Sequence, residues 1–338
     1  APMDFTTFAP VLWSASASEL RRTGASDDDW FAAHKAIWTV TGWRGPVFNE
    51  GSPLLCGAPS DAAMFTTELG GNRQLYMVYN GSLDSPGSPG LYYRLATRDA
   101  AGNWSCAAIA TPTGPEWEAL IDSRGRSAPA AAQDHFGSWS VYYLNDFGDL
   151  IARRLELAGG PWSPSFDVVR GELLDAPPSA AGNAAGVWVF YKRPSPTGTA
   201  ADVMVTAAVA PDDYRGWSAP QRLGASVNPP AAAGDGNDIY AVYETGVPTC
   251  ITGGGHLVVR RLPADDPFAV PAAPDAEAPI LWDPTDAEPL SACVRQHAIV
   301  DVDLIGQPTA GFFQGRLHVV GIAQGNCSDA AAITMVQM

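Results

Sequence analysis

Five segments of this chain repeat one pattern, in which small residues and prolines run into a short stretch of aromatic and β-branched residues. Two copies show it most clearly. Residues 176–182 read Ala-Pro-Pro-Ser-Ala-Ala-Gly and precede Val-Trp-Val-Phe-Tyr at 187–191, and residues 228–234 read Asn-Pro-Pro-Ala-Ala-Ala-Gly and precede Ile-Tyr-Ala-Val-Tyr at 239–243. A repeat of about 50 residues indicates one small structural unit used several times. Such a unit cannot bury both faces alone, so neighbouring copies must pack together.

The rest of each unit adds further short strands separated by turns. A strand with a basic residue near its end follows the aromatic strand, at 91–94, 150–154 and 256–261. A motif of glycine, tryptophan and serine comes next, with these tryptophans: Trp104, Trp162 and Trp217. A fourth strand follows, for example at 166–170. Four short strands per unit, punctuated by some of the 34 glycines and 29 prolines, predict the blades of a β-propeller.

We therefore expect an all-β chain that folds as a single-domain β-propeller over residues 1–338. Six four-stranded blades are predicted, the sixth being a degenerate N-terminal unit at 15–52. The C-terminal unit lacks a fourth strand and residues 5–13 resemble one, so we expect the N-terminal strand to close the ring and to remove an exposed sheet edge. The segment 263–291, rich in proline and acidic residues, is either a loop insertion or a seventh blade.

The charge balance limits the partners. Asp and Glu number 36 against 20 Lys and Arg, which gives a net charge of −16. Nucleic acid and anionic membrane surfaces both require a basic face, so neither is expected as a partner. The chain begins at Ala1 without a signal peptide, which could have been removed, and Asn80, Asn103 and Asn326 stand in glycosylation sequons. These features favour a secreted protein.

The five cysteines include no Cys-x-x-Cys pair, which argues against a zinc or redox centre. An odd number leaves at least one cysteine unpaired in the monomer. Cys250 and Cys293 flank the acidic segment and could form a disulfide, whereas the alternative is that the cysteines are buried free thiols.

Calcium is the one cofactor that the sequence suggests. Asp301 and Asp303, together with the acidic stretches 145–149 and 235–238, have the density of oxygen ligands that calcium requires. The alternative interpretation is that these are acidic turn residues without a metal.

The tryptophan motifs are the candidate binding sites. A sugar site combines an aromatic ring, which packs on the C–H face of the sugar, with charged groups that bond its hydroxyls. The chain offers three such pairs, with Arg153 as an alternative to Arg154 in the second: Trp104 with Arg94, Trp162 with Arg154, and Trp217 with Arg215. The alternative interpretation is that each tryptophan anchors its own hairpin.

This order of motifs resembles the fungal fucose-lectin and bacterial propeller-lectin families, clearly from about residue 53 to 224. The segment 97–104 is also similar to the Asp-box hairpin of sialidases, a structural element in that family. The lectin resemblance implies glycan sites between blades. The aromatic strands 139–143, 187–191 and 239–243 lack the arginine that fucose lectins carry there, so fucose itself is not implied.

The sequence thus predicts a carbohydrate-binding, lectin-like propeller with ligand sites at the blade rims, a binding protein rather than an enzyme. One alternative is small-molecule or cation binding in the central channel without catalysis. Another is a glycoside hydrolase with carboxylates at the channel mouth. The acids nearest the inner strands are Asp61, Asp134 and Asp235, which we interpret as turn residues, so no catalytic residue is assigned.

Overall fold

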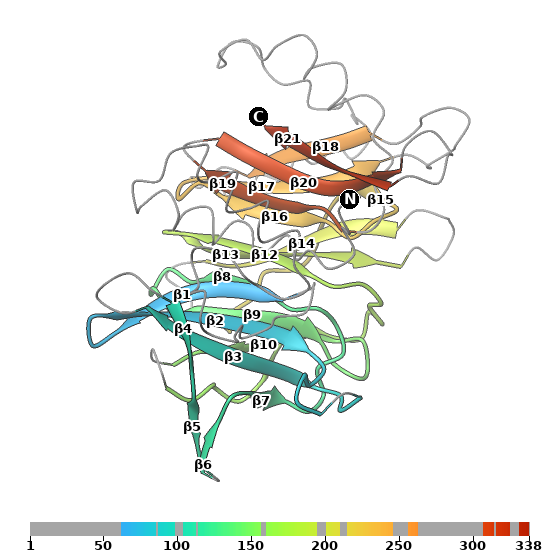
Figure 1. The fold of residues 1–338 in the computed structure, drawn as a ribbon. Coiled ribbons are helices and arrows are strands. Elements are labelled where there is room, and N and C mark those ends of the chain that lie inside the picture. Colours follow the sequence, from blue (N-terminus) through green and yellow to red (C-terminus); the bar gives the residue numbers. More distant parts are fainter. Residues whose placement is uncertain are drawn as a thin grey trace. The chain divides into compact units, whose positions relative to one another are not determined.

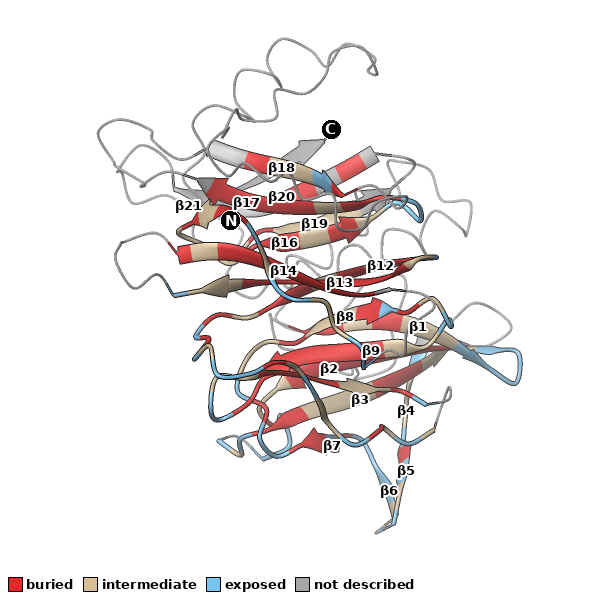
Figure 2. Cartoon of the chain, turned by 180° about the vertical axis from the view of Figure 1, so that it is seen from behind, coloured by how far each residue is buried: buried red, intermediate tan, exposed pale blue. Residues whose placement is uncertain are grey.

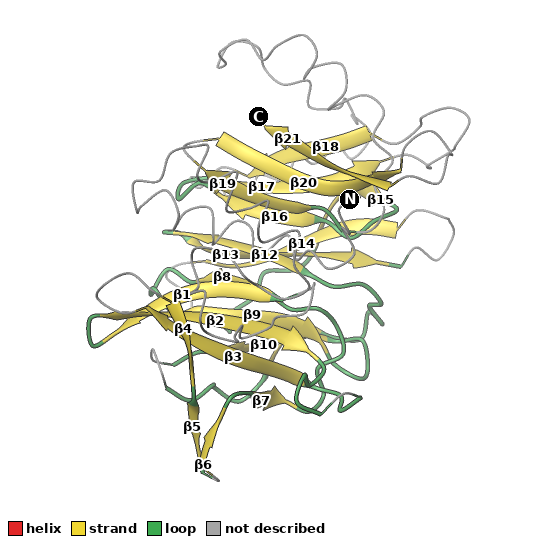
Figure 3. Ribbon diagram, in the orientation of Figure 1, coloured by secondary structure: helices red, strands yellow, loops and turns green. Residues whose placement is uncertain are grey.

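The computed structural model describes residues 62–85, 87–98, 104–112, 114–156, 160–194, 201–209, 215–245, 256–262, 307–313, 316–324 and 331–337. Within these ranges the chain consists of strands and loops, without a helix (Figure 3). Accordingly, the described part holds no helix that could cross a membrane. The all-β class predicted from the sequence is confirmed.

The contacts divide the chain into two compact units. The first comprises 1–131 and 153–165, and the second comprises 132–152 and 166–338. The prediction of a single domain stays a prediction.

The first unit is built on one antiparallel sheet in the order β1-β2-β3-β4, with β7 also paired to β3. Its main strands are β1 (Ala63–Leu69), β2 (Asn72–Asn80), β3 (Leu91–Arg98), β4 (Trp104–Ala107) and β7 (Ala119–Asp122). A separate hairpin of β5 (Ile109–Thr111) and β6 (Gly114–Glu116) extends away from this sheet (Figure 1). Strands β5, β6 and β7 were not predicted from the sequence.

The remaining sheets are up-and-down antiparallel meanders. The first has the order β11-β10-β9-β8 and the second β12-β13-β14-β15. Their strands are β8 (Ala130–Gln133), β9 (Trp139–Leu144), β10 (Leu150–Arg154), β11 (Phe166–Val169), β12 (Ser179–Asn183), β13 (Gly186–Arg193), β14 (Ala201–Val209) and β15 (Gln221–Ser226).

Two further sheets have three described strands each, in sequence order. They consist of β16 (Ala231–Gly234), β17 (Ile239–Thr245), β18 (His256–Leu262), β19 (Thr309–Phe313), β20 (Arg316–Gln324) and β21 (Ala331–Gln337). The five predicted aromatic strands are therefore β2, β9, β13, β17 and β20, and each pairs with the strand directly before it in the chain. This is the predicted blade topology of a β-propeller.

Several predictions fall outside the described residues. They are the N-terminal unit at 15–52, the closing strand at 5–13 and the acidic segment at 263–291. The number of six blades and closure by the N-terminal strand accordingly remain predictions.

The small residues of the inner strands are required by the contacts between blades. In the second unit β12 lies against β16, and β16 lies against β19. A Cβ atom added to Gly182 would stand 2.0 Å from the carbonyl oxygen of Gln133, and one added to Gly234 would stand 3.0 Å from that of Gly182. The inner strands thus approach backbone to backbone, which leaves no room for larger side chains.

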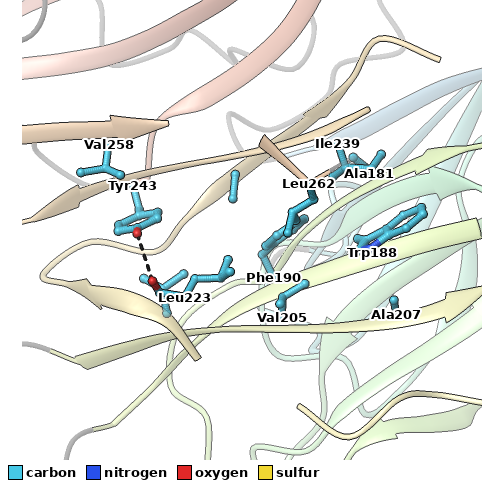
Figure 4. Packing of buried hydrophobic residues seen from close by; sticks show 12 residues of the cluster. Ala181, Trp188, Phe190, Val205, Ala207, Leu223, Ile239, Tyr243, Val258 and Leu262 are labelled. Atoms are coloured by element: carbon cyan, nitrogen blue, oxygen red, sulfur yellow. Dashed lines mark hydrogen bonds between the residues drawn. The ribbon is translucent and has the colours of Figure 1, made fainter. Parts of the chain in front are cut away.

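Apolar side chains fill the space between successive sheets. Trp188 and Phe190 of β13, Val205 of β14, and Ile239 and Tyr243 of β17 belong to one buried cluster (Figure 4). The Tyr243 hydroxyl donates to the carbonyl of Leu223, 3.4 Å away. Burial in the second unit is concentrated in the middle strands of the sheets, which include β9, β13, β14 and β17 (Figure 2). The aromatic repeat seen in the sequence is therefore the core of the fold.

Cys106 is disulfide-bonded. The interpretation of the cysteines as free thiols is therefore wrong for this residue. Cys250 and Cys293, the predicted pair, lie outside the described residues.

Candidate functional site

Each sheet has an end at which its inner strand begins and its second strand finishes. We call this the opening end, and the other the closing end. In each sheet, the loop from the second to the third strand and the connection to the next blade lie at this opening end. Loops that leave strand ends in this way are where a rigid β scaffold carries its functional groups.

The tryptophan motifs hold their own hairpins through the serine. The Ser163 hydroxyl accepts a hydrogen bond from the backbone N–H of Arg154, 3.0 Å away, and the Ser218 hydroxyl accepts one from Ala207 at the same distance. The serine N–H groups donate back to the carbonyls of the same two residues. A serine at this repeated position therefore ties each hairpin to the third strand of its blade.

Trp162 and Trp217 pack edge-on against aromatic residues of the preceding blade. The Trp162 ring meets Phe65, Tyr76 and Tyr93 at centroid distances of 6.3, 6.3 and 5.9 Å. The Trp217 ring meets Tyr142 at 5.8 Å and an interplanar angle of 85°. Such edge-to-face contacts stabilise packing, and they use the ring as a wedge between blades.

The predicted arginine partners are placed unequally. Arg154 neighbours Trp162 through the bridge between Leu155 and Trp162. The guanidinium of Arg215 stands 5.9 Å from the ring of Phe166. Arg94 lies four residues along β3 from Arg98, which pairs with Trp104, so the Cα atoms of Arg94 and Trp104 are separated by about 13 Å of strand.

Arg94 belongs instead to a cluster around Glu118 at the opening end of the first sheet. The Tyr79 hydroxyl donates to Glu118 over 2.6 Å, the N–H of Leu83 donates over 2.8 Å, and the Ser82 hydroxyl also donates. Arg94 Nε stands 3.7 Å from Glu118, and its guanidinium also pairs with Asp84. Burial, followed by the neighbouring Glu118, raises the pKa of Tyr79. These bonds make Glu118 a structural carboxylate that fixes the loop after β2.

The acids that the sequence places near the inner strands cap turns. Asp134 accepts hydrogen bonds from the N–H groups of Phe136 and Ser138, each 2.9 Å long. Asp235 accepts from those of Asn237 and Asp238. Both turns lie at the closing end. The interpretation of these two acids as turn residues is supported, and Asp61 lies outside the described residues.

The described residues include no cluster of three metal-binding side chains of the kind formed by histidine, cysteine and acids. Asn145, in the first acidic stretch, accepts from the N–H groups of Phe147 and Asp149, and so caps its own turn. Asp301 and Asp303 fall outside the described residues, so their role as calcium ligands remains a prediction.

The third blade, β12 to β15, carries a charge network at its opening end. Asp202 accepts hydrogen bonds from Arg193 at 3.0 Å and from Arg222 at 2.7 Å. Glu172 lies 3.7 Å from Arg193. Burial alone would raise the pKa of Asp202, but its hydrogen bonds and ion pairs with Arg222 and Arg193 lower it below the ordinary value. Asp202 is therefore a carboxylate that stays ionised.

A second set of polar contacts joins the third blade to the fourth blade, which begins with β16. The Asn228 side chain donates to Glu244 over 2.6 Å, and Glu244 is fully buried. The Lys192 ammonium donates to the carbonyl of Val227 over 3.4 Å. Two consecutive residues of the chain, Val227 and Asn228, thus bind Lys192 and Glu244 at the opening end.

Strand register shows that Lys192 and Glu244 are equivalent. Phe190 pairs with the first residue of β12, and Val242 pairs with the first residue of β16. Two residues beyond each stand Lys192 and Glu244. Asn80 has this position in the first blade, where Val78 pairs with Ala63. Sequence reasoning missed these residues because no motif surrounds them, although aligning the repeats on the preceding Tyr79, Tyr191 and Tyr243 would have exposed them.

Comparison with known proteins finds no matching family model and no matching curated protein by sequence. Solved structures do match in fold. The GH93 α-L-arabinofuranosidase of Fusarium graminearum with arabinobiose is 11% identical, with a TM-score of 0.44, over 82% of this chain and 74% of that chain. The α-L-arabinanase of Penicillium chrysogenum with arabinobiose is 12% identical, with a TM-score of 0.43, over 80% and 79%.

A third match is an exo-1,5-α-L-arabinanase from a bovine ruminal metagenomic library. It is 13% identical, with a TM-score of 0.37, over 82% of this chain and 92% of that chain. Likeness at this level transfers no activity, substrate or residue role to this chain. All three are nevertheless named as carbohydrate-active enzymes and none as a lectin. These comparisons contradict the prediction of a non-catalytic lectin.

Proposed function

We propose that this chain is a glycoside hydrolase and that Glu244 is the described residue that acts as its acid or base. The observation that carries the proposal is the placement of Glu244, a fully buried carboxylate bonded to Asn228 at the opening end of β17. Glycoside hydrolysis uses a carboxyl group, enclosed by protein and held in one orientation, to move a proton at the glycosidic oxygen.

Comparison of Glu244 with the equivalent residues of other blades supports a functional role for it. Tyr79, Tyr191 and Tyr243 all precede the same register position and are almost fully buried, so the tyrosine serves the common fold. The next residue differs between blades and is acidic only at Glu244 among these three. A polar residue that departs from the repeat at a strand end is better explained by a site than by packing.

Hydrolysis needs a second carboxylate, either as nucleophile or as base for a water molecule. The third blade presents Glu172 and Asp202 at its opening end, and Asp202 is held ionised by Arg193 and Arg222. A base or nucleophile must be ionised at neutral pH, so Asp202 is the better candidate for this role.

The test is release of reducing sugar from a panel of neutral oligosaccharides and polysaccharides, begun with arabinan and arabino-oligosaccharides. On a substrate that the unaltered protein cleaves, Glu244→Gln should lower kcat at least about 100-fold, because proton transfer is lost while the shape is kept. Asp202→Asn should also lower kcat.

Glu68→Gln provides the matched control, because the Glu68 side chain is 74% exposed at the closing end of β1. This variant should cleave like the unaltered protein. Full activity of a folded Glu244→Gln variant would refute the assignment of that residue, and the absence of cleavage across the panel would refute the hydrolase proposal itself.

A further inference from the structure

Two large apolar side chains are exposed at the opening end of the second blade, which consists of β8 to β11. Phe147, in the turn between β9 and β10, is 67% exposed, and Leu173, in the segment between β11 and β12, is 72% exposed. A single exposed apolar residue is ordinary, but two on interlocked loops form a surface feature.

The two loops are fixed against each other. The N–H of Leu174 donates to the carbonyl of Gly148 over 2.9 Å, and the N–H of Gly171 donates to the Asp149 carboxylate over 2.8 Å. A Cβ atom on Gly148 would stand 2.8 Å from the carbonyl oxygen of Leu174. Contact this close keeps Phe147 and Leu173 on a rigid support.

The backbone of Leu173 is strained. Its φ of 51° is the one left-handed value of a residue other than glycine in the described part of the chain. Leucine gains nothing there from packing, since its side chain is exposed, and glycine or asparagine would relieve the strain. Backbone strain that presents an apolar side chain to solvent suggests that the side chain has a ligand.

The polar groups beside this pair suit a neutral ligand. Glu172 precedes Leu173 directly and lies 3.7 Å from Arg193, which in turn bonds Asp202. With Arg222 the network holds two acids and two arginines, so its charges balance and it favours neither an anion nor a cation. It supplies both donors and acceptors, the combination that sugar hydroxyls require.

We propose that Phe147 and Leu173 form a shelf that holds a sugar unit of the substrate away from the cleaved bond, while Glu172 and Arg193 bond the hydroxyls of that unit. This inference rests on the proposed hydrolase function. Two side chains cover far less than the roughly 800 Å² per partner of a stable protein interface, which favours a sugar over a second protein chain.

The experiment measures binding and cleavage of arabino-oligosaccharides of increasing length by the full chain. Phe147→Ala should weaken binding at least about fivefold for the longer oligosaccharides and leave the shortest one unaffected, because only the longer ones reach the shelf. Leu173→Gly should weaken the same oligosaccharides and raise the melting temperature, because it removes the strain together with the side chain.

Phe136→Ala is the matched control, since Phe136 is 59% exposed in the turn at the closing end of the same blade. It should bind every oligosaccharide like the unaltered protein.

Cleavage with length dependence unchanged in Phe147→Ala and Leu173→Gly would overturn the shelf and leave the hydrolase standing. Length-dependent binding lost in both variants, without cleavage by any protein, would support the shelf and overturn the hydrolase. Dimer dissociation in Phe147→Ala without a change in sugar binding would assign this surface to a second copy of the chain and overturn the shelf.

Discussion

Lys192 and Glu244 occupy the same register position in consecutive blades, and the adjacent residues Val227 and Asn228 contact one each. Opposite charges at one repeated position cannot both serve a common packing role. Lys192 and Glu244 therefore mark a position at which the blades differ for a functional reason rather than for packing. Asn228 orients the Glu244 carboxylate.

Replacing Asn228 tests this orientation. Asn228→Ala removes one donor from Glu244, whereas Asn228→Asp places a second carboxylate within hydrogen-bond distance of it. We expect Asn228→Asp to be less stable than Asn228→Ala by about 3 kcal/mol at pH 7, since like charges would be buried together. The difference should shrink as the pH falls and one carboxylate takes up a proton. Urea unfolding across pH 4 to 8 measures it, and equal stability of the two variants throughout would contradict this arrangement.

Trp217 distinguishes packing from ligand contact. Because its ring fits edge-on against Tyr142, we expect Trp217→Ala to lower the free energy of unfolding by about 3 kcal/mol, and Trp217→Phe by less than about 1.5 kcal/mol. Thermal and urea denaturation provide the measurement. A Trp217→Ala variant as stable as the unaltered protein, but with weaker glycan binding, would instead favour the role as a sugar platform.

Gly182 should tolerate no side chain. A methyl group there would meet the Gln133 carbonyl 2.0 Å away, and both strands are held in sheets. We expect Gly182→Ala to destabilise the fold by about 3 kcal/mol or more through overpacking. Gly171→Ala is the comparison, because nothing lies within 4 Å of its added Cβ and only its φ of 79° opposes the change. A smaller loss at Gly182 than at Gly171 would mean that the inner strands are not in contact.

Tyr93 should make stability depend on alkaline pH. Burial, and then the neighbouring Tyr76, raises the pKa of Tyr93 from 10.0 to about 12. The folded chain therefore holds this proton more tightly than the unfolded chain, so the contribution to stability is complete below pH 10 and is lost as the pH rises from about 10 to 12. Tyr93→Phe keeps the ring but has no proton to lose, so its unfolding free energy should fall less over this range. Identical pH profiles would show that Tyr93 is not buried as described.

The strands could be predicted because their pattern is local. The aromatic repeat that ends at Tyr79, Tyr191 and Tyr243 marks a buried strand in each blade, and the small residues before it mark a crowded inner strand. The β5–β6 hairpin and β7 were missed because they occur in one blade and are not part of the repeated sequence pattern.

The candidate site could not be predicted in the same way. The contact between Asn228 and Glu244 joins an interblade connector to a strand end, and only the register of β16 with β17 brings them together. Leu173 was equally hidden, since its significance lies in a backbone angle and an exposure that leucine rarely combines.

The loop after β2 also has a consequence for modification of the chain. Asn80 and Ser82 form a glycosylation sequon, yet the amide nitrogen of Asn80 is buried and Ser82 is only 8% exposed, with its hydroxyl engaged by Glu118. An enzyme that attaches glycans reads both residues from an extended, accessible chain. A glycan could therefore be attached to Asn80 only before this loop packs against Glu118. A glycan on Asn80 in protein from a eukaryotic host would show that glycosylation precedes folding of the first sheet, and its absence would show that this sheet folds first.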